Sequence, residues 1–237
     1  MGNIILLDAD SLYFRVCFKT KKNNEIRTHV KKALDEVQGN NFMADMKIAV
    51  KGYGNWRKDY YPAYKANRKE LEPDMKKALK YAHEYIVGDH GAIMADGMEA
   101  DDLVAIWAYE AREAEDAYVI AGIDKDLLQI PGNHYNFVKQ EHQFIDDDLA
   151  NYKLMIQCMT GDNSDNIPGV KGIGPKKAEK FMGSRSIDRR WDRVKALWRA
   201  KNAGDPYVSW RLLKMLTSWD EYEDIKSQIQ ETKATVS

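Results

Sequence analysis

The chain has few of the residues that build disulfide frameworks and thiolate metal sites. Among 237 residues there are two cysteines, Cys17 and Cys158, and their separation is not that of a C-x-x-C motif. The sequence therefore suggests neither a disulfide framework nor a Cys-type zinc site, and reduced thiols are expected.

Long hydrophobic runs are also missing. No stretch of about 18 consecutive apolar residues occurs, and the segment from Met1 to Asp10 lacks the basic-then-apolar order of a signal peptide. We therefore expect a cytoplasmic protein without a membrane segment. The composition, 44% hydrophobic and 31% charged, is that of a globular chain with a full core.

The net charge of −1 hides a strong segregation of charge along the chain. Residues 51–80 contain nine Lys/Arg and four Asp/Glu, and residues 171–201 contain eleven and three. Acidic side chains gather instead at 96–102, 124–126 and 162–165. A protein with separate basic and acidic surfaces can bind a polyanion and hold cations next to it. Solvated helix faces of mixed charge are the alternative explanation for many of the single residues.

Short apolar runs recur along the first half of the chain, and several end at acidic residues. They predict buried strands at 4–7, 47–50, 92–95, 118–121 and 135–138. Stretches of helical length and composition lie between them, at 26–38, 73–87 and 100–114. This alternation predicts an α/β fold with a central, mostly parallel sheet and flanking helices.

The strand signal stops near Asp147. We therefore expect an α/β core at residues 1–146 and a helical region at 147–237. In open α/β sheets functional groups lie beyond the carboxyl ends of the strands. The acidic residues fall at these positions.

Eight carboxylates form the candidate ligand set. Three crowd the start of the helix predicted at 100–114, where the helix dipole favours acids but three together repel one another unless a cation intervenes. Two further pairs lie in turns, where Asp is also an ordinary turn former. The set is Asp8, Glu99, Asp101, Asp102, Asp124, Asp126, Asp162 and Asp165. Oxygen donors without matching His or Cys suit Mg²⁺ or Mn²⁺, and two such ions can promote phosphodiester hydrolysis.

A glycine-rich turn followed by lysines predicts a helix-hairpin-helix motif at about 161–182. Glycines allow close backbone approach, and Pro175 begins a helix whose N–H groups can face a phosphate. Binding of this kind is largely independent of base sequence. The expected DNA contacts are Gly169, Val170, Lys171, Gly172, Ile173, Gly174, Lys176 and Lys177. A plain Gly-Pro turn between helices is the alternative.

A second basic element, residues 55–69, interleaves aromatic side chains with Arg and Lys. This pattern offers base stacking and phosphate contacts to a single strand. The same Tyr and Trp residues could equally be core residues with polar tips.

Five motifs in order resemble the 5′-nuclease superfamily, which comprises flap endonucleases, phage 5′→3′ exonucleases and the 5′-nuclease domain of bacterial DNA polymerase I. The resemblance covers about residues 3–182. The motifs are Leu6-Leu7-Asp8 with Arg15, Tyr64-Lys65-Ala66-Asn67-Arg68, Glu99-Ala100-Asp101-Asp102, Asp124-Lys125-Asp126-Leu127, and the glycine-rich segment 161–174. It implies a PIN-like nuclease core, two Mg²⁺ or Mn²⁺ ions and a K⁺ at the backbone of Val170 and Ile173.

The resemblance also implies a role for each matched residue. Asp8, Glu99, Asp101 and Asp102 would serve the first metal ion, Asp124 and Asp126 would lie near the junction of the two sites, and Asp162 and Asp165 would complete the second. Arg57, Lys65 and Arg68 would lie at the base of a short helical arch, at about 55–85, through which a 5′ single strand passes. Lys65 and Arg68 would be the catalytic contacts to the scissile phosphate.

The chain departs from the family pattern at the second strand. The family carries an Asp directly after that strand, whereas this sequence has Lys51, Gly52 and Tyr53. Asp10 is a candidate replacement, and an N-cap for a helix at 11–18 is the alternative role for it.

These observations predict a structure-specific 5′ nuclease with exonuclease and flap endonuclease activities, acting in DNA replication, primer removal or repair. The expected partner is DNA with a free 5′ end or 5′ flap, or an RNA/DNA hybrid, bound by a monomer. A phage origin is plausible by resemblance. A non-catalytic DNA-junction-binding protein and a PIN-type ribonuclease are the alternatives; the retained carboxylates argue against the first, and the segment 162–174 argues against the second.

Overall fold

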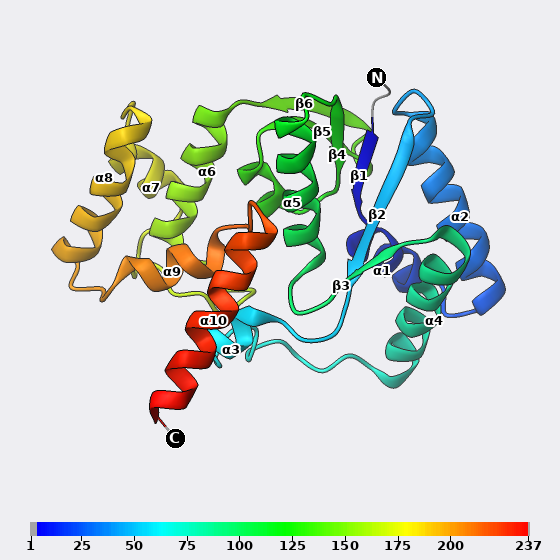
Figure 1. Ribbon diagram of the computed structural model, residues 1–237, viewed down its shortest axis with the longest axis horizontal. Coiled ribbons are helices and arrows are strands. Elements are labelled where there is room, and N and C mark those ends of the chain that lie inside the picture. The colour runs from blue at the N-terminus through cyan, green and yellow to red at the C-terminus, as the bar shows by residue number, and fades with distance from the viewer. Residues whose placement is uncertain (1–3, 237) are drawn as a thin grey trace.

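The structure is a computed structural model that describes residues 4–236. One six-stranded sheet has the order β3-β2-β1-β4-β5-β6 (Figure 1). The strands are β1 (Ile4–Asp8), β2 (Asp45–Lys51), β3 (Ile93–Ala95), β4 (Tyr118–Ala121), β5 (Gly132–Asn136) and β6 (Glu141–Ile145).

Four strand pairs are parallel, and only β5 and β6 pair in the antiparallel sense. The predicted mostly parallel sheet is therefore confirmed. Strand β6 was not predicted, because Glu141, His142 and Gln143 form no apolar run and the strand lies exposed at the edge of the sheet. The central strand β1 pairs with both β2 and β4, so the ends of these strands lie together.

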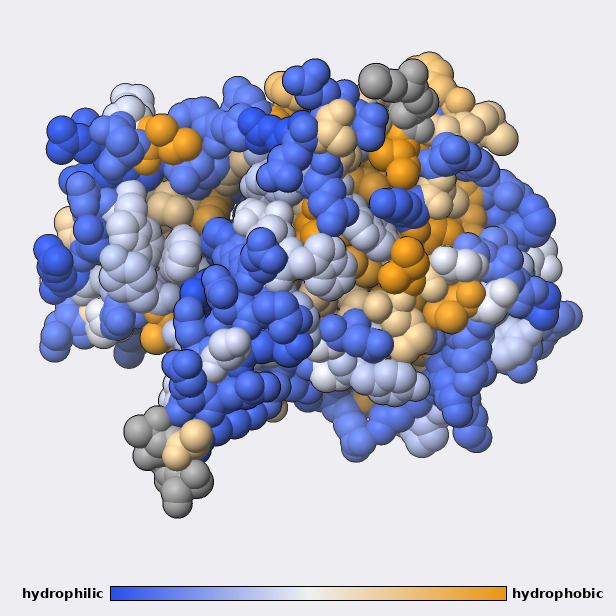
Figure 2. Space-filling model, viewed as in Figure 1, coloured by the Kyte–Doolittle hydropathy of each residue, from blue (hydrophilic) through white to orange (hydrophobic). Residues whose placement is uncertain are grey.

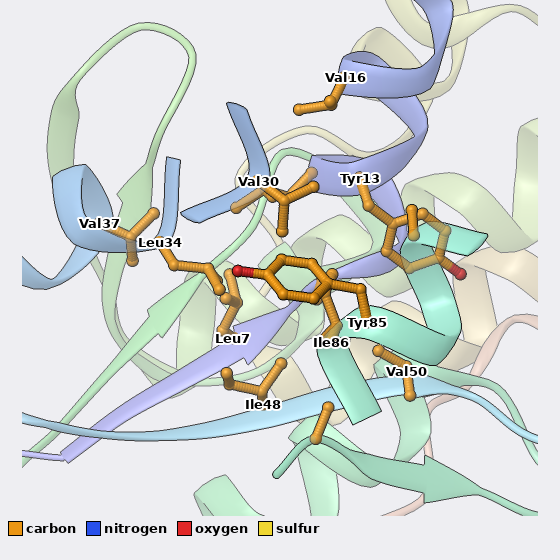
Figure 3. Close-up of a cluster of buried hydrophobic side chains, with 14 of the residues drawn as sticks. Leu7, Tyr13, Val16, Val30, Leu34, Val37, Ile48, Val50, Tyr85 and Ile86 are labelled. Carbon is orange, nitrogen blue, oxygen red and sulfur yellow. The ribbon is translucent and has the colours of Figure 1, made fainter. Parts of the chain in front are cut away.

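One face of the sheet is covered by α1 (Asp10–Lys19), α2 (Asn23–Gly39) and α4 (Pro73–His90). Figure 3 shows how Leu7 and Ile48 from the strands meet Tyr85 and Ile86 from α4. Burial of these apolar side chains against each other is the main force that holds this layer together.

The other face of the sheet is covered by α5 (Ala100–Glu113) and by the C-terminal helix α10 (Trp219–Val236). Ile225 and Ile229 of α10 share a buried cluster with Leu103 and Trp107 of α5. The expected division at residue 147 therefore needs correction, because the end of the chain returns to complete the core of the first part.

The intervening helices form a separate cluster at one end of the molecule (Figure 1). They are α6 (Asp147–Thr160), α7 (Pro175–Met182), α8 (Ile187–Ala200) and α9 (Pro206–Leu213). Trp198 is buried at the centre of this cluster, and Tyr64 from the first half of the chain joins it. The predicted helical region is thus present, and the segment around Tyr64 is attached to it.

The expected arch at about 55–85 also needs correction. Helix α4 falls in this range, yet Met75, Ala78 and Ala82 bury one of its faces in the core. The rest of the range is the end of α3 (Trp56–Tyr60) and the irregular segment 61–72, in which Tyr64 is buried in the cluster of the later helices. In place of the expected short helical arch, the structure has an irregular segment at 61–72 followed by a helix packed on the core.

The visible face in Figure 2 is mostly hydrophilic over the C-terminal helices, and its hydrophobic residues show chiefly nearer the sheet. Among the described residues no helix is long and apolar enough to cross a membrane.

Candidate active site

Asp8 ends strand β1 at the carboxyl edge of the sheet and is 3% exposed. Its carboxylate accepts hydrogen bonds from the Asp10 backbone N–H at 3.1 Å and from the Ser11 hydroxyl at 3.1 Å. The first turn of α1 therefore fixes the orientation of this carboxylate.

Two elements bring further carboxylates to the same edge. Glu99 is the N-cap of α5 and Asp101 lies in its first turn, where the helix dipole favours negative charge. Asp124 caps the short 3-10 helix η1 (Lys125–Gln129) through the Asp126 backbone N–H at 2.9 Å. Gln157 of α6 donates to the Asp126 carboxylate and holds it in place.

Crowding of these acids perturbs their pKa values. Burial raises the pKa of Asp8 to about 7, and Asp10 and Asp124 add to the effect. Burial raises the pKa of Asp101 well above its usual range, helped by Asp8 and Asp124, and burial followed by Asp124 raises that of Asp126 to about 6. The pKa of each of these carboxylates is thus raised by burial and by neighbouring charges, as is typical of functional sites.

This donor set fits hard divalent cations. Carboxylate oxygens are the ligands that Mg²⁺ and Mn²⁺ prefer, and a cation would relieve the mutual repulsion that raises the pKa values. Within residues 4–236, however, no three acidic, His or Cys side chains already form a closed coordination group.

Tyr64 and Lys65 both contact Glu99 and Asp165. Tyr64 donates its hydroxyl to Glu99 at 2.8 Å and to Asp165 at 3.1 Å. Lys65 forms ion pairs with the same two carboxylates. Burial opposes ionisation of Glu99, but Arg57 and Lys65 outweigh it and lower its pKa.

Lys65 has an uncommon backbone conformation, with φ of 57°. Its N–H donates to the Asp165 carbonyl at 2.8 Å, and Asn67 donates to the Asn163 carbonyl at 2.6 Å. Non-glycine residues adopt this left-handed conformation only where surrounding contacts enforce it. The segment that carries Lys65 is therefore held rigidly against the loop after α6.

That loop supplies the last two expected acids. Asp165 is paired with Arg68 at 2.5 Å. Asp162 is buried, and it accepts from the Ser164 N–H at 2.8 Å and from Lys125 at 2.6 Å. Burial works against its ionisation, but these contacts prevail and lower its pKa.

A cavity of about 50 Å³ gathers most of the expected residues. The acids Glu99, Asp101, Asp124, Asp126 and Asp165 line it together with Lys65 and Arg68. Asp8 is not part of the cavity wall, but its charge acts on Asp101. Asp162 lies at the edge of the group, beside Lys125.

Two expected site residues, Arg57 in the cavity wall and Asp102 outside the cavity lining, are held in a buried ion pair. Arg57 is 3% exposed and Asp102 is 0% exposed, and they form a two-pronged ion pair in which one N–O distance is 2.9 Å. Arg57 also donates to the Leu212 carbonyl at 2.7 Å, and Asp102 accepts from the Leu216 N–H at 3.2 Å. Arg57 as a DNA contact and Asp102 as a metal ligand are therefore corrected to a structural pair.

The i, i+3 spacing of Glu99 and Asp102 suggested a shared ligand face. The structure uses that spacing as a capping box, in which each side chain accepts from the other residue's backbone N–H. The pattern of two acids three residues apart at a helix start was the signal for this role. The partner Arg57 lies 45 residues away and leaves no local signal.

The predicted DNA-binding turn lies between α6 and α7. Gly172 has φ of 78°, the Ile173 N–H donates to the Val170 carbonyl at 3.0 Å, and Lys177 donates to the Gly172 carbonyl at 2.9 Å. Lys171 and Lys176 are exposed. Gly169 packs so closely that a Cβ there would lie 2.1 Å from the Thr160 carbonyl carbon.

Asp10 and the end of β2 meet at the position where the family acid is missing. The Lys51 N–H donates to Asp10 Oδ1 at 2.9 Å, and the Tyr13 hydroxyl donates to the same oxygen at 2.8 Å. The N-cap of α1 is Ala9, so Asp10 does not serve as the N-cap. Sequence reasoning missed Asp96, which accepts from the Tyr53 N–H at 2.8 Å and orders the turn after β2.

Comparison with known proteins agrees with this geometry. Residues 3–154 match the family model of the 5′-3′ exonuclease N-terminal resolvase-like domain. The chain is 31% identical over 248 residues to the thermostable DNA polymerase I of Thermus aquaticus, which covers 91% of this chain and 29% of the polymerase. It is 29% identical over 139 residues to the flap endonuclease Xni of Shewanella baltica, covering 54% of this chain and 52% of Xni.

The D15 protein of phage T5, whose structure was solved with metal ions, superposes with a TM-score of 0.69 at 18% identity, over 97% of this chain and 98% of that one. This match shows the shared fold. The chain spans about half the length of Xni and a smaller share of the polymerases it matches. With the family model covering more than half of its residues, the chain belongs to the family of 5′-3′ exonuclease N-terminal resolvase-like domains.

Proposed function

We propose that the protein is a structure-specific 5′ nuclease that hydrolyses DNA phosphodiesters at or near a free 5′ end. One observation carries this proposal: five carboxylates and three cationic side chains, Arg57, Lys65 and Arg68, line a single cavity at the carboxyl edge of the sheet. Acids that can hold cations, beside bases that can hold a phosphate, are the parts that phosphodiester hydrolysis requires. The family membership supports the same reaction class.

The carboxylates are the proposed holders of two Mg²⁺ or Mn²⁺ ions. Asp8, Asp101, Asp124 and Asp126 would hold one ion or share it with the next, and Asp165 and Asp162 extend the group toward the second. When bound, such ions activate water and stabilise the leaving oxygen.

Lys65 and Arg68 are the proposed phosphate contacts. Both are now paired with carboxylates, Lys65 with Glu99 and Arg68 with Asp165. These pairs keep the cationic groups directed into the cavity, where they can form charge-assisted hydrogen bonds to a scissile phosphate. The hydrogen bond from the Lys65 backbone N–H to the Asp165 carbonyl restricts the movement of the residue that carries this cation.

The turn between α6 and α7 is the proposed duplex contact. The exposed Lys171 and Lys176 and the start of α7 offer positive charge and backbone N–H groups to a phosphate backbone. Lys177 is held by the Gly172 carbonyl and stabilises the turn itself. The turn would place duplex DNA beside the cavity, because Asp165 and the turn belong to one loop. A K⁺ at the Val170 and Ile173 backbone belongs to the same proposal.

The test is cleavage of an end-labelled 5′-flap duplex in Mg²⁺, in Mn²⁺ and in EDTA. We expect cleavage that requires the divalent ion and a free 5′ end, performed by a monomer, with activity on an RNA/DNA hybrid as well. Asp101→Asn should abolish turnover, whereas Asp35→Asn, a surface acid paired with Lys31 on α2, should not. Tight binding without cleavage in any divalent ion would show a junction-binding protein. Cleavage of single-stranded RNA without need of a 5′ end would show a ribonuclease.

A further inference from the structure

A second, larger cavity adjoins the carboxylate cavity. Its volume is about 730 Å³, and it lies between the start of α1, the end of β2 and the first half of α4. Arg68 lines both cavities, and Ile123 of the larger one immediately precedes Asp124. A DNA strand bound at the carboxylates could therefore continue into the larger cavity. Cavities of about 300–1,000 Å³ are the usual size of small-ligand sites.

The charge that faces this larger cavity is predominantly positive. Arg15, Lys51, Arg68 and Lys80 line it, and Asp10 is the acid opposite them. Oδ1 of Asp10 is already taken by the Lys51 N–H and the Tyr13 hydroxyl. Within residues 4–236 the charged groups of Arg15 and Lys51 have no ion-pair partner. Unpaired cations around a cavity favour an anionic ligand.

The same cavity has exposed aromatic and aliphatic walls. Tyr53 is 80% exposed and Phe14 is 40% exposed, and Leu71 lies on the side that leads to Arg68. Exposed rings beside cations are the features on which nucleic-acid bases stack, whatever their identity. The cavity thus combines a phosphate-binding part with a base-binding part.

We propose that this cavity binds the nucleotide immediately 5′ of the scissile bond, with Lys51 as the principal contact to that nucleotide's 5′ phosphate. The proposal rests on the proposed nuclease function, whose substrate it narrows. Among residues 4–236 the Lys51 ammonium forms no ion pair, although its positive charge favours the ionised form of the nearby Asp10 carboxylate. The Lys51 backbone is fixed by Asp10 and by His83, whose ring nitrogen lies 2.8 Å from the Lys51 carbonyl. The enzyme would accordingly prefer ends that carry a 5′ phosphate and release nucleoside 5′-phosphates.

Three duplexes that differ only at the 5′ end test this proposal. The first has a recessed 5′ phosphate, the second a 5′ hydroxyl, and the third a 5′ hydroxyl preceded by one extra unpaired nucleotide, which places a diester phosphate at the same position. We expect kcat/KM at the same bond to fall at least tenfold from the first to the second, and to recover in the third. Equal rates on the first two, or no recovery in the third, would overturn the proposal.

Charge-removing variants identify the contact. Lys51→Met, and separately Lys80→Met, should lower the ratio of phosphate to hydroxyl rates toward one. Lys153→Met, an exposed lysine on α6 away from the cavity, should leave that ratio unchanged. Both cavity lysines are exposed, so folding can be verified by an unchanged Tm. A normally folded Lys51→Met variant with the wild-type ratio would exclude Lys51 as the contact.

Binding without catalysis separates this proposal from the proposed function. In EDTA, fluorescence anisotropy should show tighter binding of the 5′-phosphorylated duplex than of the hydroxyl duplex, with a smaller difference for Lys51→Met. A binding difference without any cleavage in divalent ions would leave the cavity in place and refute the nuclease. Cleavage in divalent ions without a difference in binding would support the nuclease function and refute the proposed 5′-phosphate contact in this cavity.

Discussion

Asp101 is half-buried among other acids at the start of α5, and this position should cost the metal-free protein stability. The pKa of Asp8 is about 7 and that of Asp126 about 6 in the folded chain, both above the usual value. Raised carboxyl pKa values mean that the folded state binds protons more tightly than the unfolded state. Stability should therefore fall as pH rises from about 4 through about 7.

The Asp101→Asn variant should remove part of this repulsion. In EDTA at pH 8 we expect its Tm to exceed that of the wild type by about 2–4 °C for each kcal/mol of repulsion relieved, while nuclease turnover is lost. Adding millimolar Mg²⁺ should raise the Tm of the wild type more than that of the variant, since only the wild type keeps the full ligand set. If the Asp101→Asn variant were less stable than the wild type at pH 8, charge repulsion at Asp101 would not be a source of instability in the metal-free protein.

Lys65 and Arg68 should affect the reaction more than substrate binding. Lys65→Met or Arg68→Met is expected to lower single-turnover cleavage by about 10²–10³-fold, the usual effect of losing one contact to developing charge. Affinity for the flap duplex, measured by anisotropy in EDTA, should change much less. Lys58→Met, an exposed neighbour in α3, is the matched control. If the variants lost affinity for the duplex but cleaved it at the normal rate, Lys65 and Arg68 would have no role in the cleavage step.

Residue types alone indicated which acids come together in one cavity, but they could not decide which of two neighbouring acids enters the cavity and which pairs inside the core. Asp102 and Asp101 are sequence neighbours, and only the buried partner Arg57 sends one of them into the core while the other lines the cavity. A distant partner of this kind leaves no periodic or local pattern in the sequence.

At the scale of elements, the Arg57–Asp102 pair joins α3 to α5 and to the segment after α9. Removing one member leaves a buried charge without its partner, which typically costs about 3–5 kcal/mol. We expect Arg57→Ala to unfold at a clearly lower urea concentration than the wild type. The double variant Arg57→Met with Asp102→Leu should regain much of that loss, because no unpaired charge remains.

A surface pair provides the control for this measurement. Arg112 and Asp147 form a similar two-pronged pair, but both are exposed. Exposed pairs contribute about 0–1 kcal/mol, so Arg112→Ala should shift the urea midpoint only slightly. Equal losses for Arg57→Ala and Arg112→Ala would contradict the structural role of the buried pair.

The turn between α6 and α7 leads to a salt-dependence prediction. Lys171→Ala with Lys176→Ala should weaken duplex binding at low salt and reduce the slope of log affinity against log salt by about two, because two phosphate contacts release fewer counterions. Removal of Lys177 should instead destabilise the turn, since its amine is bound to the Gly172 carbonyl. If the double variant kept the wild-type slope, Lys171 and Lys176 would not be the residues that contact the duplex.

Most strands and helices were predictable because their apolar residues keep a regular spacing. Strand β6 and the packing of α4 against the core were not predictable. The strand carries polar side chains at an exposed edge, and the helix reads as amphipathic whether its apolar side faces a sheet or lines an arch. Periodicity shows that a helix has a buried face, and it does not show what covers that face.

At the scale of the whole molecule, the C-terminal helix is part of the first core. Ile225 and Ile229 are buried against α5, and Tyr222 lies over Gly97 with its hydroxyl bonded to the Asp96 carbonyl. A chain ending at residue 217 would expose this apolar surface. We expect it to unfold at least 10 °C below the full chain by circular dichroism and to lose nuclease activity with it.

Sequence analysis could not foresee this return of the chain, because residues 219–236 show only an ordinary amphipathic pattern. Helix α8 serves as the comparison, since it packs in the separate cluster of the later helices. Substitution of its buried Val194 by Ala should destabilise that cluster while leaving the contacts between α5 and α10 intact. The expected division at residue 147 is therefore a boundary in sequence pattern and not in packing.

The contacts of Asp102 have a consequence for the order of events during synthesis. Arg57 donates to the Leu212 and Lys214 carbonyls, and Asp102 accepts from the Leu216 N–H. A nascent chain that has emerged only as far as α6 already contains every carboxylate except Asp162 and Asp165, yet the helix that presents Glu99 and Asp101 is not locked. The ribosome must deliver more than fifty further residues before the cutting site is held in shape. On the proposed function, chains that end before Leu216 would be poor nucleases, because Glu99 and Asp101 would not be held in position.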